Sequence, residues 1–229
     1  MCRISESKQK RVWIDNFETL RCSGCPHLDS IPPNLVNLEE LDCSICPLLT
    51  SISSTLVNLQ KLICFDYPRL TSIPSLMNLQ ELYCDNCPLL TCISTTMTNL
   101  RRLGCDNCPR LTSIPPTLLN LHILDCFDCL LLTSIPQTLV NLHTVNCNDC
   151  PFLTAIPPSL VNLQSLSCSG CPFVYIPKRY QHKKSPLPAR GIRDAVQRAR
   201  NQLALRSLVS RELDLYLLPP LIRMTTNLL

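Results

Sequence analysis

The stretch Leu100–Asn120 reads LRRLGCDNCPRLTSIPPTLLN, and the same pattern recurs on both sides of it. Written from its first leucine, the repeated unit is L-x-x-L-x-C-x-x-C-P-x-L-T-S-I-P-x-T-L-x-N, with a period of 21 residues. Self-similarity at a fixed period of this length predicts a solenoid, in which each unit packs on its two neighbours. The eight copies begin at Phe17, Leu38, Leu59, Leu79, Leu100, Leu121, Leu142 and Leu163.

Each unit is expected to hold one short strand and an irregular return. The alternation of Leu103 with Cys105 predicts a strand with one buried face. Pro109 removes a backbone donor, and the Ile114-Pro115-Pro116 step fixes φ twice, so the return half cannot be a regular α-helix. It should be extended or 3₁₀ and should serve as the crossover that parallel strands require.

These residues resemble the leucine-rich repeat family, whose unit L-x-x-L-x-L-x-x-N/C-x-L forms a strand on the inner side of a horseshoe. The resemblance spans residues 17–177. The unit looks most like the C-x-x-L-x-x-L-P subtype familiar from plant immune receptors. Two features depart from that subtype: the chain has no nucleotide-binding P-loop, and cysteine replaces leucine at the sixth position. Similar cysteine-rich arrays occur in proteins of giant viruses. The resemblance implies an α/β-type solenoid with a parallel β-sheet on the concave face and an extended or 3₁₀ convex side.

The Cys-x-x-Cys pairs are predicted to be structural. Such a pair often marks a zinc or redox site, but here it recurs through the repeats. In the family frame the sixth position points into the core and the ninth occupies an inward ladder position, and free cysteine suits both. Tyr67 replaces the ninth cysteine of the third copy, proline usually follows the pair, and no helix pattern follows to lower a thiol pKa. Zinc and redox roles stay as disfavoured alternatives, and no metal or cofactor is expected.

Other recurrent residues also have structural explanations. The fourth, twelfth, fifteenth and nineteenth positions, which are Leu103, Leu111, Ile114 and Leu118 in the fifth copy, should form the stacked core. Asparagine ends seven copies, where its side chain is expected to mimic a backbone turn.

Charge divides the chain into three parts. Residues 1–16 form an N-terminal flank with net charge +2, the repeats at 17–177 carry −6, and residues 178–229 carry +8. The third part begins with KRYQHKKSPLPARG, interpreted as a basic linker. A C-terminal helix is predicted over residues 192–215, with Ile192, Val196, Ala199 and Leu203 on one face. This helix could cap the last repeat or dock a partner or membrane surface. The basic cluster Lys178, Arg179, Lys183 and Lys184 could be a nuclear signal or a nucleic-acid patch, and the sequence leaves these alternatives open.

The compartment is inferred from two absences. The first twenty residues contain no apolar core of a signal peptide, and no window approaches the length of a membrane helix. A cytoplasmic, reducing location with free thiols is therefore expected.

Function is expected on the variable, solvent-facing positions of the concave sheet: the second, third, fifth, seventh and eighth. Eleven acids and four bases there give a net charge of −7, and aromatic residues in the same columns are typical of contact anchors. We expect a non-enzymatic module that binds a protein with a basic surface, and no nucleic acid on this face. The alternative is an adaptor whose C-terminal segment docks a ubiquitin-ligase or other host complex while the repeats select a client. The candidate partner-binding residues are Phe65, Tyr83, Asp85, Arg101, Asp106, Asp125, Phe127, Asp128 and Asp149.

An enzymatic interpretation is weak. His122 and His143 fall in the same column of adjacent copies, where they should approach to about 5 Å, near Asp125. Two histidines and an acid at this spacing are typical of surface residues, and the sequence shows no three-histidine site.

Overall fold

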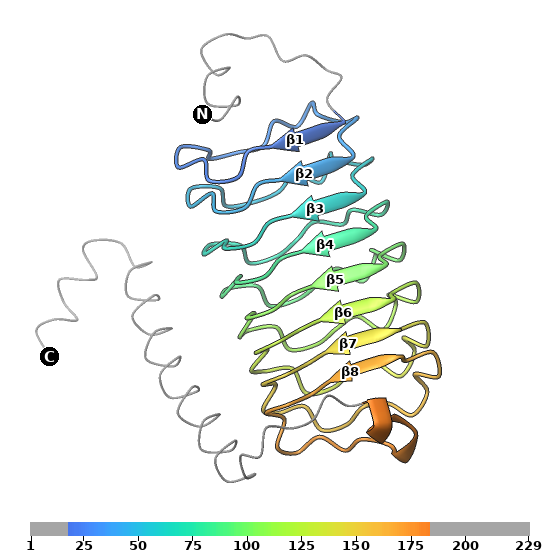
Figure 1. Cartoon of the computed structure of the whole chain (residues 1–229). Helices are drawn as coiled ribbons and strands as arrows, with labels where there is room; N and C mark the ends of the chain where they lie inside the picture. Colours follow the sequence, from blue (N-terminus) through green and yellow to red (C-terminus); the bar gives the residue numbers. More distant parts are fainter. Residues whose placement is uncertain (1–17, 184–229) are drawn as a thin grey trace, which may run out of the picture. The chain divides into compact units, whose positions relative to one another are not determined.

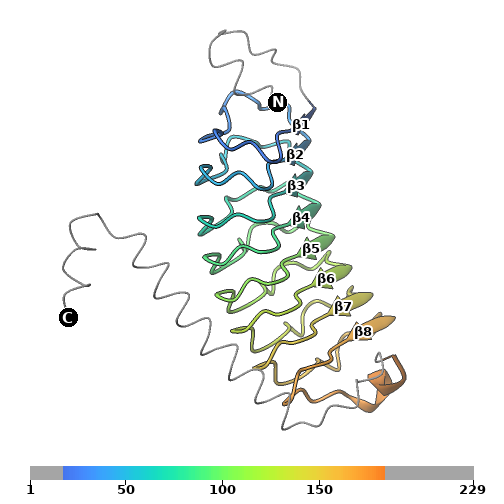
Figure 2. The same ribbon diagram turned by 60° about the vertical axis from the view of Figure 1, so that its left-hand side comes forward.

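The computed structural model describes residues 18–183, so the N-terminal flank and the predicted C-terminal helix lie outside the described residues. Eight parallel strands form a single sheet in chain order (Figure 1). Figure 2 shows the strands along one side of the stack and the returning loops on the other. The strands are β1 (Thr19–Arg21), β2 (Glu40–Asp42), β3 (Lys61–Ile63), β4 (Glu81–Tyr83), β5 (Arg102–Gly104), β6 (Ile123–Asp125), β7 (Thr144–Asn146) and β8 (Ser165–Ser167).

The strand register confirms the repeat frame. Each strand occupies the third to fifth positions, and its central residue pairs with the same position in the next repeat, as in Leu82 with Leu103 and Leu103 with Leu124. The third repeat is one residue short, between Pro74 and Leu76, yet β3 and the following strand β4 still pair in this register. The convex side therefore absorbs the deletion.

The convex side is extended and turned, as predicted. Two tight turns per repeat are closed by bonds from an N–H to the carbonyl three residues earlier, which is the 3₁₀ pattern. In the fifth repeat Leu111 donates to Cys108 at 3.1 Å, and Leu121 donates to Leu118 at 3.0 Å.

The core is a stack of identical layers. Leu103, Leu111 and Leu118 have no exposed surface, and Ile114 is 1% exposed. Each such side chain contributes roughly 1.5–3 kcal/mol when buried. Because a single layer would leave these side chains open above and below, no repeat can be stable alone.

The cysteine columns are part of this core, which confirms their structural interpretation. A ninth-position thiol donates to the carbonyl of the sixth residue in the preceding repeat: Cys108 to Cys84 at 3.2 Å, and Cys129 to Cys105 at 3.1 Å. Burial raises the pKa of Cys22 to about 12. The Cys22 thiol therefore stays protonated at neutral pH. The buried cysteines of both columns pack as small apolar residues with a weak donor.

Three residues depart from this pattern. Cys25 is disulfide-bonded, so the prediction of a free thiol at this position is wrong. Cys92 is exposed and lies outside both columns. Tyr67 is fully buried at the ninth position of the third repeat, and its hydroxyl has no hydrogen-bond partner.

The terminal asparagines act between repeats. Asn120 Nδ2 donates to the carbonyl of Thr98 in the preceding repeat at 3.0 Å, and Asn141 does the same to Leu119 at 2.8 Å. The predicted structural role of these asparagines is confirmed, but their side chains bond to a carbonyl of the neighbouring layer instead of mimicking a backbone turn.

The last repeat continues directly into the 3₁₀ helix η1 (Lys178–Lys183). Tyr180 is 1% exposed, and its hydroxyl donates to the Pro158 carbonyl of the previous repeat at 3.0 Å. The linker interpretation is therefore wrong for residues 178–183, which pack on the solenoid. Among the described residues no helix has the length and apolar character needed to cross a membrane.

Candidate functional site

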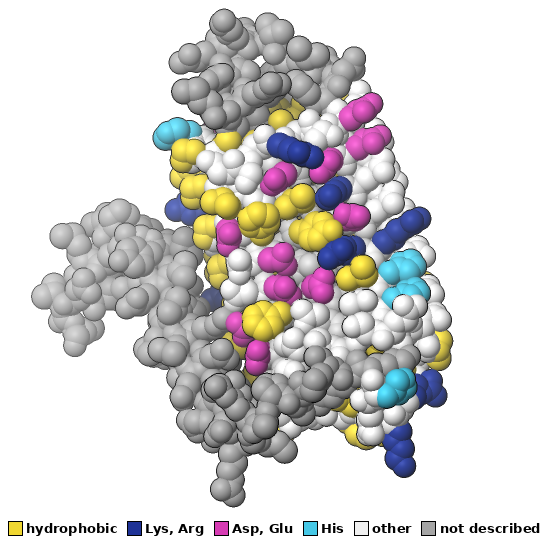
Figure 3. Space-filling view, in the orientation of Figure 1, with side chains coloured by type: hydrophobic (Ala, Val, Ile, Leu, Met, Phe, Trp, Pro, Cys, Tyr) yellow, Lys and Arg dark blue, Asp and Glu magenta, His cyan; other side chains and the backbone are white. Residues whose placement is uncertain are grey.

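The outer face of the sheet, called here the sheet face, carries the side chains of the second, third, fifth and seventh positions. Third-position charges alternate along β2 to β5, and Lys61 Nζ lies 3.8 Å from Glu40 Oε1 and 3.7 Å from Glu81 Oε2. These ion pairs offset part of the predicted acidic excess on the strands. In Figure 3 acidic, basic and hydrophobic side chains are interspersed on this face.

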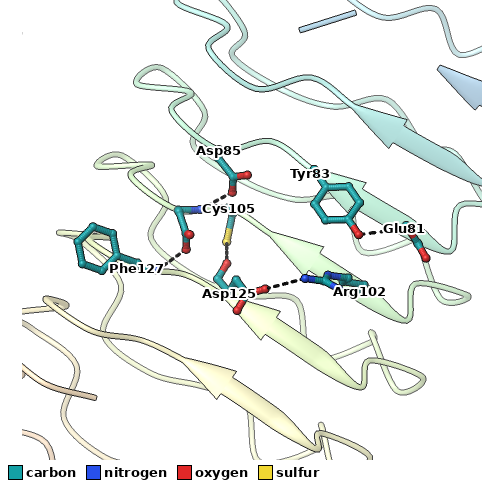
Figure 4. Close-up of polar contacts among 8 residues, drawn as sticks. Glu81, Tyr83, Asp85, Arg102, Cys105, Asp125 and Phe127 are labelled. Carbon is teal, nitrogen blue, oxygen red and sulfur yellow. Dashed lines mark hydrogen bonds and ion pairs between the residues drawn. The ribbon is translucent and has the colours of Figure 1, made fainter. Parts of the chain in front are cut away.

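A central cluster of four residues, Glu81, Tyr83, Arg102 and Asp125, lies across β4 to β6 (Figure 4). The Tyr83 hydroxyl donates to Glu81 Oε2 at 3.2 Å. The Arg102 guanidinium lies 5.3 Å from the centre of the Tyr83 ring and 3.6 Å from Asp125 Oδ2. Contacts on both sides fix the tyrosine ring, so it presents a rigid aromatic surface.

Gly104 leaves room beside this ring. A Cβ atom at Gly104 would lie 3.3 Å from Tyr83 Cδ1 and 3.2 Å from Asp85 Oδ1. Any larger residue would therefore crowd both side chains, and the glycine keeps one edge of the tyrosine open. Gly104 and the roles of Glu81 and Arg102 were not predicted from the sequence. The alternating charges of the third position were the available signal.

Two seventh-position carboxylates form a ladder beside the cluster. Asp85 Oδ1 accepts the N–H of Asp106 at 2.9 Å, and Asp106 Oδ1 accepts the N–H of Phe127 at 2.6 Å. Asn148 makes the equivalent bond to the N–H of Ser169 at 2.6 Å. The seventh-position side chain therefore satisfies a backbone donor of the next repeat, which an amide can do as well as a carboxylate.

Burial makes ionisation of this ladder costly. Desolvation raises the pKa of Asp106 to about 6, and the charges of Asp85 and Asp125 add to the shift. Desolvation also raises the pKa of Asp85 and of Asp125, although Arg102 opposes the shift at Asp125. Within the described residues Asp85 and Asp106 have no ion-pair partner.

Eighth-position residues have a backbone role that was not predicted from the sequence. The eighth residue of each described repeat has a positive φ, for example 56° at Asp128 and 54° at Asp149. Asp, Asn and Gly tolerate this left-handed conformation, which explains the acids there. Asp128 is 7% exposed, so its side chain is not available to a partner. The residues are Gly24, Ile45, Asp66, Asn86, Asn107, Asp128, Asp149 and Gly170.

The remaining candidates lie at the margins. Phe65 and Phe127 precede and follow the two ladder carboxylates in the seventh-position row, and Phe127 is 38% exposed. Arg101 lies in a separate groove of about 590 Å³ along the second-position row, lined mainly by amide side chains and His122. The structure therefore brings together Tyr83, Asp85, Asp106, Asp125 and Phe127, but separates Arg101, Asp128 and Asp149 from them.

His122 and His143 lie close together as predicted, and their rings stack with centroids 5.2 Å apart. Among residues 18–183 no group of three or more His, Cys, Asp or Glu side chains is arranged to hold a metal ion. That the chain takes no metal or cofactor stays a prediction.

Comparison with known proteins supports the fold. No protein-family model and no curated protein matches the sequence. The leucine-rich repeat domain of the type III effector XopL is structurally similar, with a TM-score of 0.52, 25% identity, and coverage of 72% of this chain and 61% of that structure. The plant peptide hormone receptor RGFR1, solved in complex with RGF2, has a TM-score of 0.45, 18% identity and coverage of 69% and 35%.

The order of the strands, their register and the buried leucine layers agree with this similarity. The resemblance to giant-virus arrays stays a prediction, since no comparison bears on it. The chain has the leucine-rich repeat fold, built here from a cysteine-rich repeat of 21 residues.

Proposed function

We propose that the solenoid is a protein-binding module that holds a basic partner on the sheet face. The contact would centre on Tyr83, Asp85, Asp106, Asp125 and Phe127. Rigid aromatic side chains supply most of the energy at such interfaces, and charged neighbours set the association rate and the selectivity. The proposal is for a binding module without enzymatic activity.

One observation carries this proposal: three partly buried carboxylates lie close together, and Arg102 pairs with only Asp125. Desolvation by burial, with added repulsion from Asp85 and Asp125, raises the pKa of Asp106 to about 6. A lysine or arginine brought to Asp85 and Asp106 would relieve this repulsion, whereas a phosphate would increase it. The surface therefore favours a cationic partner and disfavours nucleic acid.

The test is selection from a random peptide library against the immobilised full chain. Enriched peptides should contain Lys or Arg together with an apolar residue. Tyr83→Ala should weaken their binding by about 30-fold or more, which corresponds to about 2 kcal/mol. Phe152→Ala is the control, because Phe152 is an exposed aromatic residue, 39% exposed, that lies outside the sheet face.

Asp106→Asn should slow association at low salt with a small effect on dissociation, as expected for a charge that steers encounter. Selected peptides without basic residues would contradict the proposed basic partner. Equal binding by Tyr83→Ala and the wild type would show that the sheet face is not the binding site.

The adaptor alternative requires a second partner for residues beyond 183, which lie outside the described residues. It predicts two partners that can be separated by mutation, because sheet-face changes would affect the client alone. We propose a reducing, cytoplasmic setting for either function, since the free thiols of the core suit it. The disulfide at Cys25 is the observation that opposes this setting.

A further inference from the structure

An exposed apolar row, called here the stripe, runs along the solenoid at the twentieth position of the repeat. Its side chains are exposed by 39% at Val140 and by up to 62% at Met77 and Val161. Single exposed apolar residues are common, but a continuous row across seven repeats is typical of an interaction surface. Thr98 is the one polar residue in the row. The other members are Val36, Val57, Met77, Leu119, Val140 and Val161.

Polar rows on both sides of the stripe hold it in place. Asn162 Nδ2 donates to the Val140 carbonyl at 3.1 Å, and the same asparagine bond recurs at each earlier member of the stripe. On the other side, the Thr138 hydroxyl donates to the Pro116 carbonyl of the preceding repeat at 2.6 Å. The stripe is therefore rigid and preformed, so covering it costs little conformational entropy. An apolar centre with a polar rim is also the usual anatomy of a protein interface.

The order of residues along the stripe is nearly symmetric. Thr98 lies at the middle of the seven positions, Met77 and Leu119 lie on its two sides, and two valines follow at each end. A contact with two-fold symmetry requires such an order, because the same surface faces itself. If two stripes lie antiparallel with the axis at Thr98, every apolar residue faces another of similar size. The facing pairs would be Val36 with Val161, Val57 with Val140, and Met77 with Leu119.

The lack of charge around the stripe also favours a second copy of the chain as its partner. Positions seventeen to twenty-one carry no charged residue in any of the seven repeats. A basic partner, as proposed for the sheet face, would leave its ions unpaired here, and burying an unpaired ion is costly. A second copy brings the same neutral surface, so no charge is buried.

The size of the stripe is sufficient for a weak dimer. It crosses six repeat steps of about 4.8 Å and is therefore roughly 29 Å long. Seven side chains at about half exposure, together with the two polar rows, offer on the order of 500 Å² per copy, so a dimer would bury on the order of 1,000 Å² in total, at the lower limit of specific interfaces. A reversible dimer that depends on concentration is therefore expected.

We propose that two copies of the chain associate through their stripes, in antiparallel order and with the two-fold axis at Thr98. The contact uses none of the residues of the sheet face. It removes the apolar row from water, and Thr98 fixes the register because a shift by one repeat would place each threonine against an apolar residue.

Sedimentation equilibrium of the full chain tests the proposal. The wild type should change from monomer to dimer as its concentration rises, with a Kd on the order of 10 µM. Val57→Lys and Val140→Asp should each raise the Kd at least about tenfold, because each places a charge against a valine of the other copy. Leu131→Asp is the matched control for Val140→Asp, because Leu131 is also 39% exposed but belongs to another column. It should leave the Kd unchanged.

The double variant Val57→Lys and Val140→Asp tests the antiparallel order. The two positions are four repeat steps, or about 19 Å, apart, so the new charges cannot pair within one chain. In antiparallel order each new lysine faces the new aspartate of the other copy, and the Kd should return to within about threefold of the wild-type value. In parallel order lysine would face lysine, and the double variant would stay monomeric.

Thr98→Val tests the axis without adding charge, and it remains informative where a charged variant does not fold. It should lower the Kd at least about threefold, because no hydroxyl is then buried at the axis. A higher Kd in this variant, or a double variant that stays monomeric, would overturn the proposed register. A wild type that is monomeric at millimolar concentration would overturn the dimer itself. A dimer that Val140→Asp leaves intact, or that Leu131→Asp weakens equally, would show that the stripe is not the interface.

Discussion

Replacing Asp106 with asparagine should stabilise the protein at neutral pH. Asp106 Oδ1 accepts the Phe127 N–H, and an asparagine oxygen can accept the same bond, as Asn148 does with Ser169. The substitution therefore keeps the hydrogen bond and removes a partly buried negative charge that lies close to Asp85 and Asp125.

The magnitude follows from the pKa. The folded-state pKa of Asp106 is about 6, against about 3.9 in an unfolded chain. Because the folded value is higher, the native state holds the proton more tightly, and stability is lost as pH rises from about 4 through 6. A difference of about two units corresponds to at most about 3 kcal/mol. The carboxylate is partly exposed, so solvent screening reduces the expected effect to about 1 kcal/mol.

Urea unfolding followed by circular dichroism between pH 4 and pH 8 measures this effect. The variant and the wild type should have equal free energies of unfolding near pH 4, and the variant should gain about 1 kcal/mol by pH 8. The reciprocal substitution Asn148→Asp should lose stability over the same range. A variant that is less stable at pH 8, or a difference that does not change with pH, would refute the reasoning.

Three further predictions concern strain, an unpaired hydroxyl and thiol access. Gly170→Ala should lower the free energy of unfolding by about 2 kcal/mol or more, because φ is 74° and a Cβ would collide with the Asp149 carboxylate. Gly24 has a similar φ of 70°, but no atom lies within 4 Å of the Cβ position, so Gly24→Ala should lower the free energy of unfolding by about half as much. Equal losses in the two variants would contradict this prediction. Tyr67→Phe should raise the free energy of unfolding by about 1 kcal/mol in a urea titration, because it removes a buried hydroxyl without a partner. A lower free energy of unfolding would reveal a bond to that hydroxyl. Ellman's reagent should modify Cys92 quickly and the buried thiols slowly, because only Cys92 is exposed among the free cysteines of the described residues. Cys92→Ser should remove one fast-reacting equivalent. An unchanged fast phase would show that another thiol is accessible.

The sequence predicted the architecture well because the repeat fixes it directly. The spacing of Leu103, Cys105, Cys108 and Leu111 recurs unit by unit, so one assignment of buried positions applies to all repeats. Proline on the return side excluded helices. The direction of the asparagine bonds was not predictable, because it depends on the distance between stacked layers rather than on local sequence.

The site was predicted less completely. All the acidic residues of the sheet were predicted to be surface charges. At the eighth position, however, aspartate occurs because it tolerates the left-handed backbone conformation of that position. The mixture of Gly, Asn and Asp in that column was a usable signal, but Ile45, at φ 55°, obscured it. The bond from Asp106 to the next repeat could not be inferred either, because its partner is a backbone N–H that only the stacked geometry brings close.

The thiol bonds between layers have a mechanical consequence. From the second repeat onward, each ninth-position cysteine links its layer to the one before, as Cys108 does with Cys84, so a force applied to the two ends would load similar junctions in series. Layers should detach one at a time, and each release should lengthen the chain by about 70 Å when its 21 residues extend. The junction at Tyr67 lacks the sulfur donor. Under tension this junction should be the first to open, so the solenoid should separate between its second and third repeats before the other junctions open.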